Sequence, residues 1–308
     1  MNAYMQKTVK NEVGCHSVGL HSGRKINMTI KPAGVDKGIV FCRKDLLNDN
    51  KVKAEVTNVS DTILATTIGL NGTRVSTVEH LMSAFFGMGI DNAFVEIDSF
   101  EVPIMDGSAL PFIGMLREAG IEVQDKPRKY MVIKKPISVS DEEGEARLMP
   151  SDEFQITYNI DFDHPLIGKQ SYHMVFSRDR YEQDISEART FGFLREVEYL
   201  QAKGLALGGS LKNAIVLDDE KVINKDGLRA KDEFVKHKIL DAIGDLFLLG
   251  MPIIGHFWAH KSGHKLNNLL LRKLLSHRER WEIVQFSNGE EERETLSNSF
   301  LEGIPAGL

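Results

Sequence analysis

The chain has 308 residues, 42% of them hydrophobic and 27% charged, and its formal net charge of −6 argues against a general nucleic-acid binder. The N-terminus lacks the apolar segment of a signal peptide, and the longest apolar run, 246–259, is shorter than the about 18 residues of a membrane span, so we expect a cytosolic protein. The two cysteines, Cys15 and Cys42, supply neither a metal-binding pair nor a disulfide framework.

The first 70 residues predict β-strands, because apolar side chains alternate with polar ones around 26–30 and 52–56. Within these first 70 residues lies a turn, 17–23, that is bracketed by glycines and carries His21. Taken alone, His21 is expected to be a turn residue and not a catalytic one. Two further strands are predicted over 61–68 and 73–76.

A helix is predicted to begin near Ser76 and to stop at the glycines 87–89. The sequence Ser76-Thr-Val-Glu79 fits a capping box, in which Glu79 would reach back to the Ser76 amide. His80 follows directly. A carboxylate next to a histidine, just after a strand, is also a suitable place for a metal ligand and its base, so both interpretations stay open here.

The best domain boundary is the polar, proline-containing segment 124–129. It follows a strand, a tight turn and a helix over 92–119. We therefore predict an N-terminal α/β domain, 1–126, and a C-terminal α/β domain, 127–308. Strands are expected to restart over the ranges 130–133, 137–140, 146–149, 154–160 and 170–176.

The segment 186–217 interrupts this pattern with apolar residues, glycines and one short helix near 197–203. It predicts an apolar βαβ insertion near 193–223. Such a segment lines a ligand cavity or is simply a packed insert, and the residues alone favour neither.

The stretch 234–249 predicts one buried helix with a single charged stripe, formed by His237, Lys238, Asp241 and Asp245. Buried carboxylates need strong partners, and an exposed i,i+4 pair contributes only about 0.3–0.5 kcal/mol. A His and an Asp one turn apart can hold a divalent metal, or they form a plain hydrogen bond. A third ligand from elsewhere would decide for the metal.

After this helix come the basic turn 261–265, with His264, and a predicted helix over 266–284. A histidine between lysines is most often a solvated loop residue. The end of the chain, 287–308, is rich in glutamate and then weakly apolar, and is expected to be frayed.

Five motifs together resemble one family, and they occur over nearly the whole chain in the family's order. They are Val18-Gly-Leu-His-Ser22, Thr77-Val-Glu-His80, Pro103-Ile-Met-Asp-Gly-Ser108, His237-Lys-x-x-Asp241 and Ser262-Gly-His264. The chain resembles the UDP-3-O-acyl-N-acetylglucosamine deacetylases, zinc amidases of the lipid A pathway in Gram-negative bacteria. The resemblance implies an α+β fold of two similar two-layer α/β domains, in a β-α-α-β sandwich, with the zinc site between them.

The resemblance also implies a role for each residue of the site. The Zn²⁺ ligands would be His80, His237 and Asp241, which leave one position open, as catalytic zinc requires. Glu79 would be the general base. His264 would be the protonated group that steadies the oxyanion and protonates the leaving amine, and Asp245 would hold its imidazolium.

Other residues would then bind the substrate. Thr190 matches a hydroxyl that donates to the oxyanion. Lys238 matches a basic residue that reaches the nucleotide-sugar, and Phe191 matches an aromatic residue whose ring packs against the hexosamine. The insertion would form the passage for the 3-O-acyl chain, with substrate-binding residues Phe193, Val197, Ala206, Gly209, Ser210 and Val216. Ala65 stands where several members carry cysteine, and Leu211 and Asn213 also depart from common choices, which leaves the preferred acyl length open.

The expected function is hydrolysis of the acetamide of UDP-3-O-(3-hydroxyacyl)-N-acetylglucosamine, the committed step of lipopolysaccharide biosynthesis, by a cytoplasmic monomer. Two alternatives remain. One is a different zinc amidohydrolase acting on a nucleotide-sugar, and the other is a binding module in which the metal only joins the domains. A structural zinc has four protein ligands and no general base beside it, whereas three ligands together with Glu79 and His264 favour an enzyme.

Overall fold

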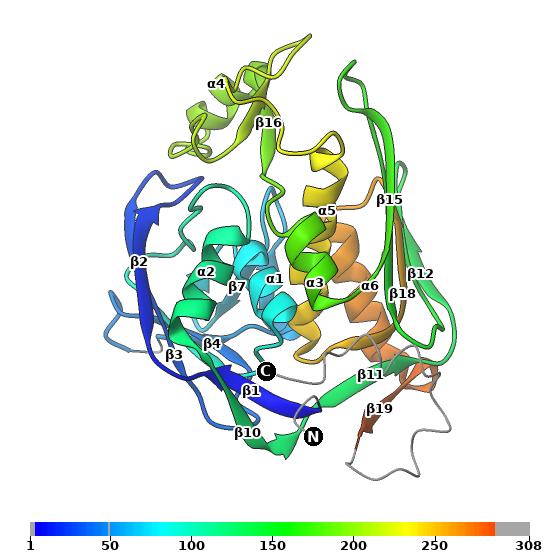
Figure 1. Ribbon diagram of the computed structural model, residues 1–308. Helices are drawn as coiled ribbons and strands as arrows, with labels where there is room; N and C mark the ends of the chain where they lie inside the picture. The colour runs from blue at the N-terminus through cyan, green and yellow to red at the C-terminus, as the bar shows by residue number, and fades with distance from the viewer. Residues whose placement is uncertain (1–3, 49, 287–308) are drawn as a thin grey trace.

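A computed structural model of the chain describes residues 4–48 and 50–286. The protein has two halves, each with a β-sheet on the outside and helices on the inside, so that the helices of the two halves meet in the middle (Figure 1). This arrangement confirms the predicted α+β class. The tail 287–308, for which fraying was predicted, lies outside the described residues.

The N-terminal half is built on a five-stranded sheet in which only one neighbouring pair, β9 with β4, is parallel. In β3, the buried side chains are Ile26, Met28 and Ile30, in the alternation that the sequence predicts. The strands, in spatial order, are β2 (Val13–Val18), β3 (Lys25–Pro32), β9 (Ala93–Ile97), β4 (Ile39–Arg43) and β5 (Lys51–Lys53).

Two helices, α1 (Glu79–Met88) and α2 (Leu110–Ala119), cover the inner face of this sheet (Figure 1). All but one of the side chains of α1 are buried, so it is an internal helix. It ends at Gly89, whose φ of 72° is left-handed and therefore suits glycine, as the predicted stop requires.

A small antiparallel sheet lies beside α1 and consists of β6 (Val59–Asp61), β7 (Thr67–Leu70) and β8 (Thr73–Val75). A 3-10 turn, η1 (Val56–Asn58), precedes it. The single strand predicted over 61–68 is wrong, because the chain turns between β6 and β7. In this turn the Asp61 carboxylate accepts the N–H groups of Thr62 and Ile63, a local bond that competes with strand pairing.

The C-terminal half contains a seven-stranded sheet. Its long strand β18 (Ile253–His260) lies at the centre and pairs with three others, in parallel with β14 and β11 and antiparallel with β13. The other strands are β11 (Lys129–Ile133), β12 (Ile137–Ser140), β13 (Glu145–Met149), β14 (Phe154–Phe162), β15 (Gly168–Val175) and β19 (Trp281–Gln285).

The inner helices of this half are α5 (Glu233–Leu246), continued by η3 (Phe247–Leu249), and α6 (His264–Ser276). The helix predicted over 266–284 is too long. It starts earlier, at His264, and ends at Ser276, after which η4 (Arg278–Arg280) leads into β19. The reason is tertiary, since Trp281 to Gln285 complete the sheet by pairing with β11.

The two halves are joined by a ribbon of β1 (Met5–Val9) and β10 (Ile121–Pro127), which crosses below the helices in Figure 1. The predicted domain boundary after residue 126 falls inside β10 and stays a prediction. Arg128, between β10 and β11, is fixed by the side chain of Asp91, whose Oδ1 accepts from its Nε at 2.6 Å.

The insertion forms β16 (Phe191–Phe193), α4 (Leu194–Ala202) and β17 (Ile215–Leu217), with the two strands parallel. It stands above the helix layer in Figure 1. A short α3 (Arg178–Arg180) and the π-helical turn η2 (Tyr181–Ile185) lead toward it.

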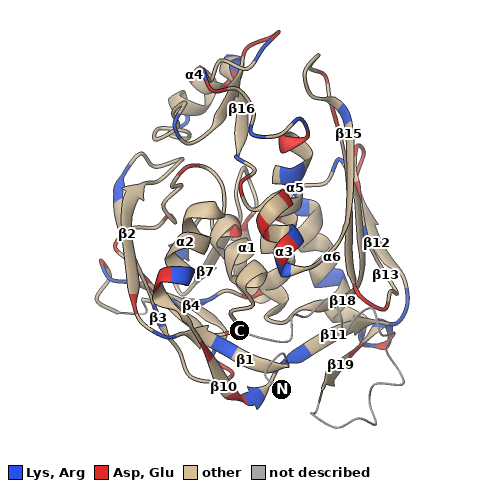
Figure 2. Ribbon diagram, viewed as in Figure 1, with Lys and Arg blue, Asp and Glu red and all other residues tan. Residues whose placement is uncertain are grey.

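No helix in the described part of the chain is both long and apolar enough to span a membrane. In the view of Figure 2, acidic and basic residues are interspersed along the ribbon, in keeping with a net charge of only −6.

Candidate metal centre and its surroundings

The centre is built where α1 meets α5. Gly244 on α5 makes this contact possible, because a Cβ atom there would lie 2.0 Å from the carbonyl oxygen of Glu79. His237 and Asp241 occupy the preceding turns of α5 and face the same side, because they are four residues apart. The close approach of the helices brings His80, the second residue of α1, against them.

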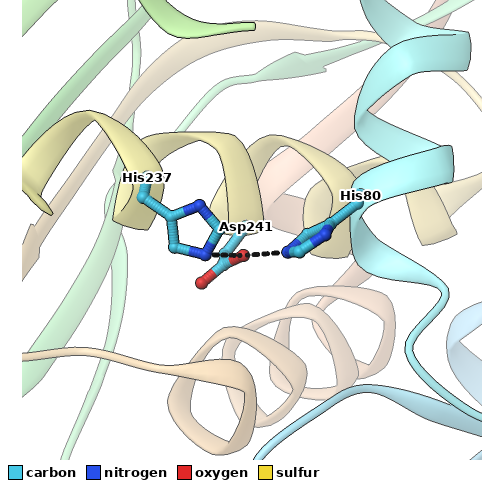
Figure 3. Close-up of side chains that lie close together, drawn as sticks. All are labelled: His80, His237 and Asp241. Atoms are coloured by element: carbon cyan, nitrogen blue, oxygen red, sulfur yellow. Dashed lines mark ion pairs between the residues drawn. The ribbon is translucent and has the colours of Figure 1, made fainter. Parts of the chain in front are cut away.

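Three donor atoms converge at this point, as Figure 3 shows. Asp241 Oδ1 lies 3.4 Å from His80 Nε2 and 3.3 Å from His237 Nε2, and all three ligand atoms lie within 4.8 Å of one another. Two donor atoms that share a tetrahedral ion at about 2.1 Å are about 3.4 Å apart. The spacing therefore fits a metal.

The protonation state and the hydrogen bonding of the buried donor atoms also fit a metal. Among the described residues no hydrogen bond reaches Asp241 Oδ1. Burial lowers the pKa of His237 to about 4, so its imidazole is neutral, and its Nδ1–H donates to Ala188 O at 3.0 Å, which leaves the Nε2 lone pair free. Burial alone would raise the pKa of Asp241, but the positive charges of His237, which is protonated only at acidic pH, and of Lys238 outweigh burial and hold the pKa well below its ordinary value.

Glu79, the first residue of α1, is 3% exposed and lies next to this centre. Its Oε2 accepts from the Thr66 amide at 3.0 Å. The capping box proposed for Ser76 and Glu79 is wrong, because the Ser76 amide donates to Phe100 O and Val78, not Ser76, precedes the helix. Burial is the main cause that raises the pKa of Glu79, against the opposing charge of His264.

His264 faces Glu79 from the start of α6, with 3.8 Å between its Nε2 and Glu79 Oε1. Its Nδ1 lies 2.9 Å from Asp245 Oδ2. Burial would lower the pKa of His264, but the carboxylates of Asp245 and Glu79 dominate and raise it to about 9, so the imidazole carries a proton at neutral pH. His264 is thus a buried residue of the centre and not a solvated loop residue.

Of the residues expected to bind substrate, Lys238 directly contacts one of the three candidate metal ligands. Its Nζ donates to Asp241 Oδ2 at 2.7 Å, and this contact is partly buried. The lysine therefore neutralises the carboxylate ligand on the side away from Oδ1.

Thr190 and Phe191 enter from the segment that leads into β16. The Thr190 amide donates to Gly107 O at 2.8 Å, and Phe191 packs against Phe234 and, with ring centroids 6.2 Å apart, against His237. This segment is held on α5 by a buried ion pair, in which Arg189 Nε lies 2.8 Å from Glu233 Oε1.

The other expected substrate residues lie in the insertion, away from the three ligands. Phe193 contacts Phe162 and His164, and none of the described residues of α4, including Val197, is fully buried. The loop after α4 contacts the His21 turn, because Leu207 N donates to His21 O and Gly208 N to Leu20 O. Ala206, Gly209 and Ser210 belong to this loop, and Val216 belongs to β17.

Sequence reasoning missed several contributors. Asn267 Nδ2 donates to Asp245 Oδ2 at 2.9 Å, and Thr66 contacts both Glu79 and Asp245. His21 does lie in a turn. Burial is the main cause that lowers its pKa, against the Glu101 carboxylate, and the nearby His264 and His80 act in the same direction as burial, so the turn lies at the edge of the centre. No motif or spacing marks Thr66 or Asn267, because their role depends on contacts between distant segments.

Comparison with known proteins agrees with this geometry. A sequence model of the family described as UDP-3-O-acyl N-acetylglycosamine deacetylase matches residues 6–276. The chain is 57% identical over 308 residues to the UDP-3-O-acyl-N-acetylglucosamine deacetylase of Syntrophus aciditrophicus, with 98% of this chain and 97% of the relative covered. The proteins of the same name from Hahella chejuensis (53% identity, 93% and 95% covered) and Pseudomonas entomophila (50% identity, 98% and 99% covered) are similar too.

Proposed function

The chain belongs to the UDP-3-O-acyl-N-acetylglucosamine deacetylase family, and we propose on this premise that it hydrolyses the acetamide of UDP-3-O-(3-hydroxyacyl)-N-acetylglucosamine to the free amine and acetate. The observation that carries the proposal is the buried group of His80, His237 and Asp241 with a carboxylate and an imidazolium beside it. A metal that only joined the two halves would need neither.

The metal that we propose is zinc. Two imidazoles and one carboxylate are a common ligand set of hydrolytic zinc, with one position left for water or substrate. His80, His237 and Asp241 would hold the ion. When bound, zinc supplies a Lewis acid that polarises the amide carbonyl and makes water a better nucleophile.

Glu79 and His264 would divide the proton transfers between them. Glu79, ionised, takes a proton from the attacking water. His264, protonated, stabilises the negative oxygen that develops on the acetamide and then gives its proton to the leaving nitrogen. Asp245 keeps the imidazolium oriented through its 2.9 Å contact with Nδ1, and the Thr190 hydroxyl would donate to the same developing oxygen.

Residues of α5, β16 and the insertion would bind the substrate. We propose that Lys238 contacts the polar part of the nucleotide-sugar. The ring of Phe191 would pack against the face of the hexosamine. The acyl chain would follow the insertion, along the side chains of Phe193, Val197, Ala206, Gly209, Ser210 and Val216. The loop after α4 carries the small residues Ala206, Gly209 and Ser210, and this composition supports the choice.

The reaction belongs to lipid A biosynthesis, and we propose that the protein carries it out in the cytoplasm as a monomer with a domain boundary near residue 126. A test of the function is direct. Metal-stripped protein should release no acetate from the UDP-sugar, and one equivalent of zinc should restore release together with an equal amount of free amine. Zinc binding without any acetate release would favour the non-catalytic alternative.

A further inference from the structure

Thr66 touches both sides of the acid-base pair. Its N–H donates to Glu79 Oε2 at 3.0 Å, and its hydroxyl donates to Asp245 Oδ1 at 2.5 Å. The residue is 2% exposed, and the hydroxyl distance is in the range of charge-assisted O–H···O⁻ bonds. A single residue thus connects the carboxylate that would take a proton to the carboxylate that holds His264.

The backbone around Thr66 is held in an unusual conformation. Leu64 has a φ of 61° and Thr77 a φ of 58°, a left-handed region that non-glycine residues, and β-branched ones above all, seldom occupy. The amide of Val78, which follows Thr77, donates to Thr66 O at 3.3 Å. Such strain persists only where the surrounding structure fixes it, and here the hydrogen bond from Val78 holds Thr66 against the start of α1.

The carboxylate of Asp245 depends on the Thr66 hydroxyl. Its Oδ2 accepts from His264 and Asn267, both at 2.9 Å, while its Oδ1 accepts from Thr66. Without the hydroxyl, Oδ1 would lose its charge-assisted bond and the carboxylate could rotate about its bond to Cβ. The His264 ring, 3.8 Å from Glu79 Oε1, would move with it.

We propose that Thr66 is a positioning residue that sets the placement of Glu79 relative to His264, through its amide on one side and its hydroxyl on Asp245 on the other. The proposal rests on the proposed function, because it presumes that Glu79 and His264 carry the proton transfers. It adds a residue that touches neither substrate nor metal.

The test compares Thr66→Val, which loses the hydroxyl but keeps shape and amide, with Thr66→Ser, which keeps the hydroxyl. In zinc-loaded protein, Thr66→Val should lower kcat roughly 10- to 100-fold, as misplaced catalytic groups do, while KM changes by less than about threefold. Thr66→Ser should stay close to wild type. The matched control is Thr67→Val, since Thr67 is the adjacent buried threonine and its hydroxyl donates to Ser76 Oγ at 2.8 Å.

Crystal structures of the zinc-loaded variants give a readout independent of activity. In Thr66→Val the Asp245 carboxylate should be rotated and His264 displaced, whereas both should be unmoved in Thr66→Ser and Thr67→Val. If Thr66→Val does not fold, Thr66→Ala, which avoids a branched apolar side chain, must show the same changes.

Unaltered kcat and an unmoved Asp245 in Thr66→Val would overturn the proposal, and so would a Thr66→Ser variant as impaired as Thr66→Val. Failure of the proposed function looks different. In that case wild-type protein releases no acetate, and the position of Asp245 in the crystal structures alone decides whether Thr66 holds it.

Discussion

Gly244 on α5 lies so close to Glu79 on α1 that a Cβ atom would be 2.0 Å from the Glu79 carbonyl oxygen. Because the obstacle is backbone, a Gly244→Ala variant must push the two helices apart. We expect a loss of about 1–3 kcal/mol in the free energy of unfolding. Zinc affinity should also fall, because His80 and Asp241 belong to different helices.

The matched control is Gly114→Ala on α2, where no atom lies within 4 Å of an added Cβ and alanine is the better helix former. Thermal unfolding and zinc titration of both variants provide the measurement. Wild-type zinc affinity in Gly244→Ala would show that the helix approach does not shape the centre.

The ligands are tested by removing them one at a time. His80→Ala, His237→Ala and Asp241→Ala should each retain well below one equivalent of zinc, because two protein ligands hold the ion much more weakly. Stability should fall less than activity, since a large hydrophobic core that runs through both halves stays intact. His173→Ala, on an exposed strand position, is the control. Full zinc in all three ligand variants, measured by elemental analysis, would remove these residues from the metal.

The pH dependence follows from the two shifted groups. In the proposed mechanism, activity requires ionised Glu79, whose pKa burial raises, and protonated His264, whose pKa is raised to about 9. The rate should therefore rise as pH increases through the Glu79 pKa, above the ordinary value of about 4.3, and fall again near pH 9, with apparent values that belong to the coupled pair. His264→Gln should abolish the fall at high pH. A rate still climbing beyond pH 10 would contradict the acid role.

Much of this site could be predicted from the sequence. Helical spacing predicts that His237 and Asp241 of α5 face the same side, where they hold a metal or form a hydrogen bond, and five ordered motifs identify the family. What could not be predicted depends on contacts between distant segments. Asp245 is fixed by Thr66, Asn267 and His264, which no local pattern connects.

The errors in the predicted fold also come from contacts between distant segments. The helix predicted to reach residue 284 ends at Ser276, because the following residues gain more by pairing as β19 with β11. The residues 76–79 fit the local pattern of a capping box, but the Ser76 amide donates instead to the carbonyl oxygen of the distant residue Phe100. Local signals hold where they agree with the tertiary contacts and fail where they compete with them.

The insertion is tested by its effect on substrate choice. If it encloses the acyl chain, each buried methylene contributes up to about 0.8 kcal/mol, so the long-chain substrate should be strongly preferred over one without the acyl group. Gly209→Trp should remove this preference, as should Ala206→Phe, although the φ of 54° at Ala206 makes the latter variant more strained. Zinc content is the control for folding. Full long-chain preference in both variants would place the acyl group elsewhere.

The central claim, that Glu79 beside the metal carries out the hydrolysis, is tested most directly by acetate release from the UDP-sugar by wild-type and Glu79→Gln protein at equal zinc content. Glutamine keeps the size of the side chain and an oxygen to accept from the Thr66 amide, but it cannot take up the proton. We predict full zinc and a loss of at least about 100-fold in kcat. Near-normal acetate release by Glu79→Gln would contradict the account.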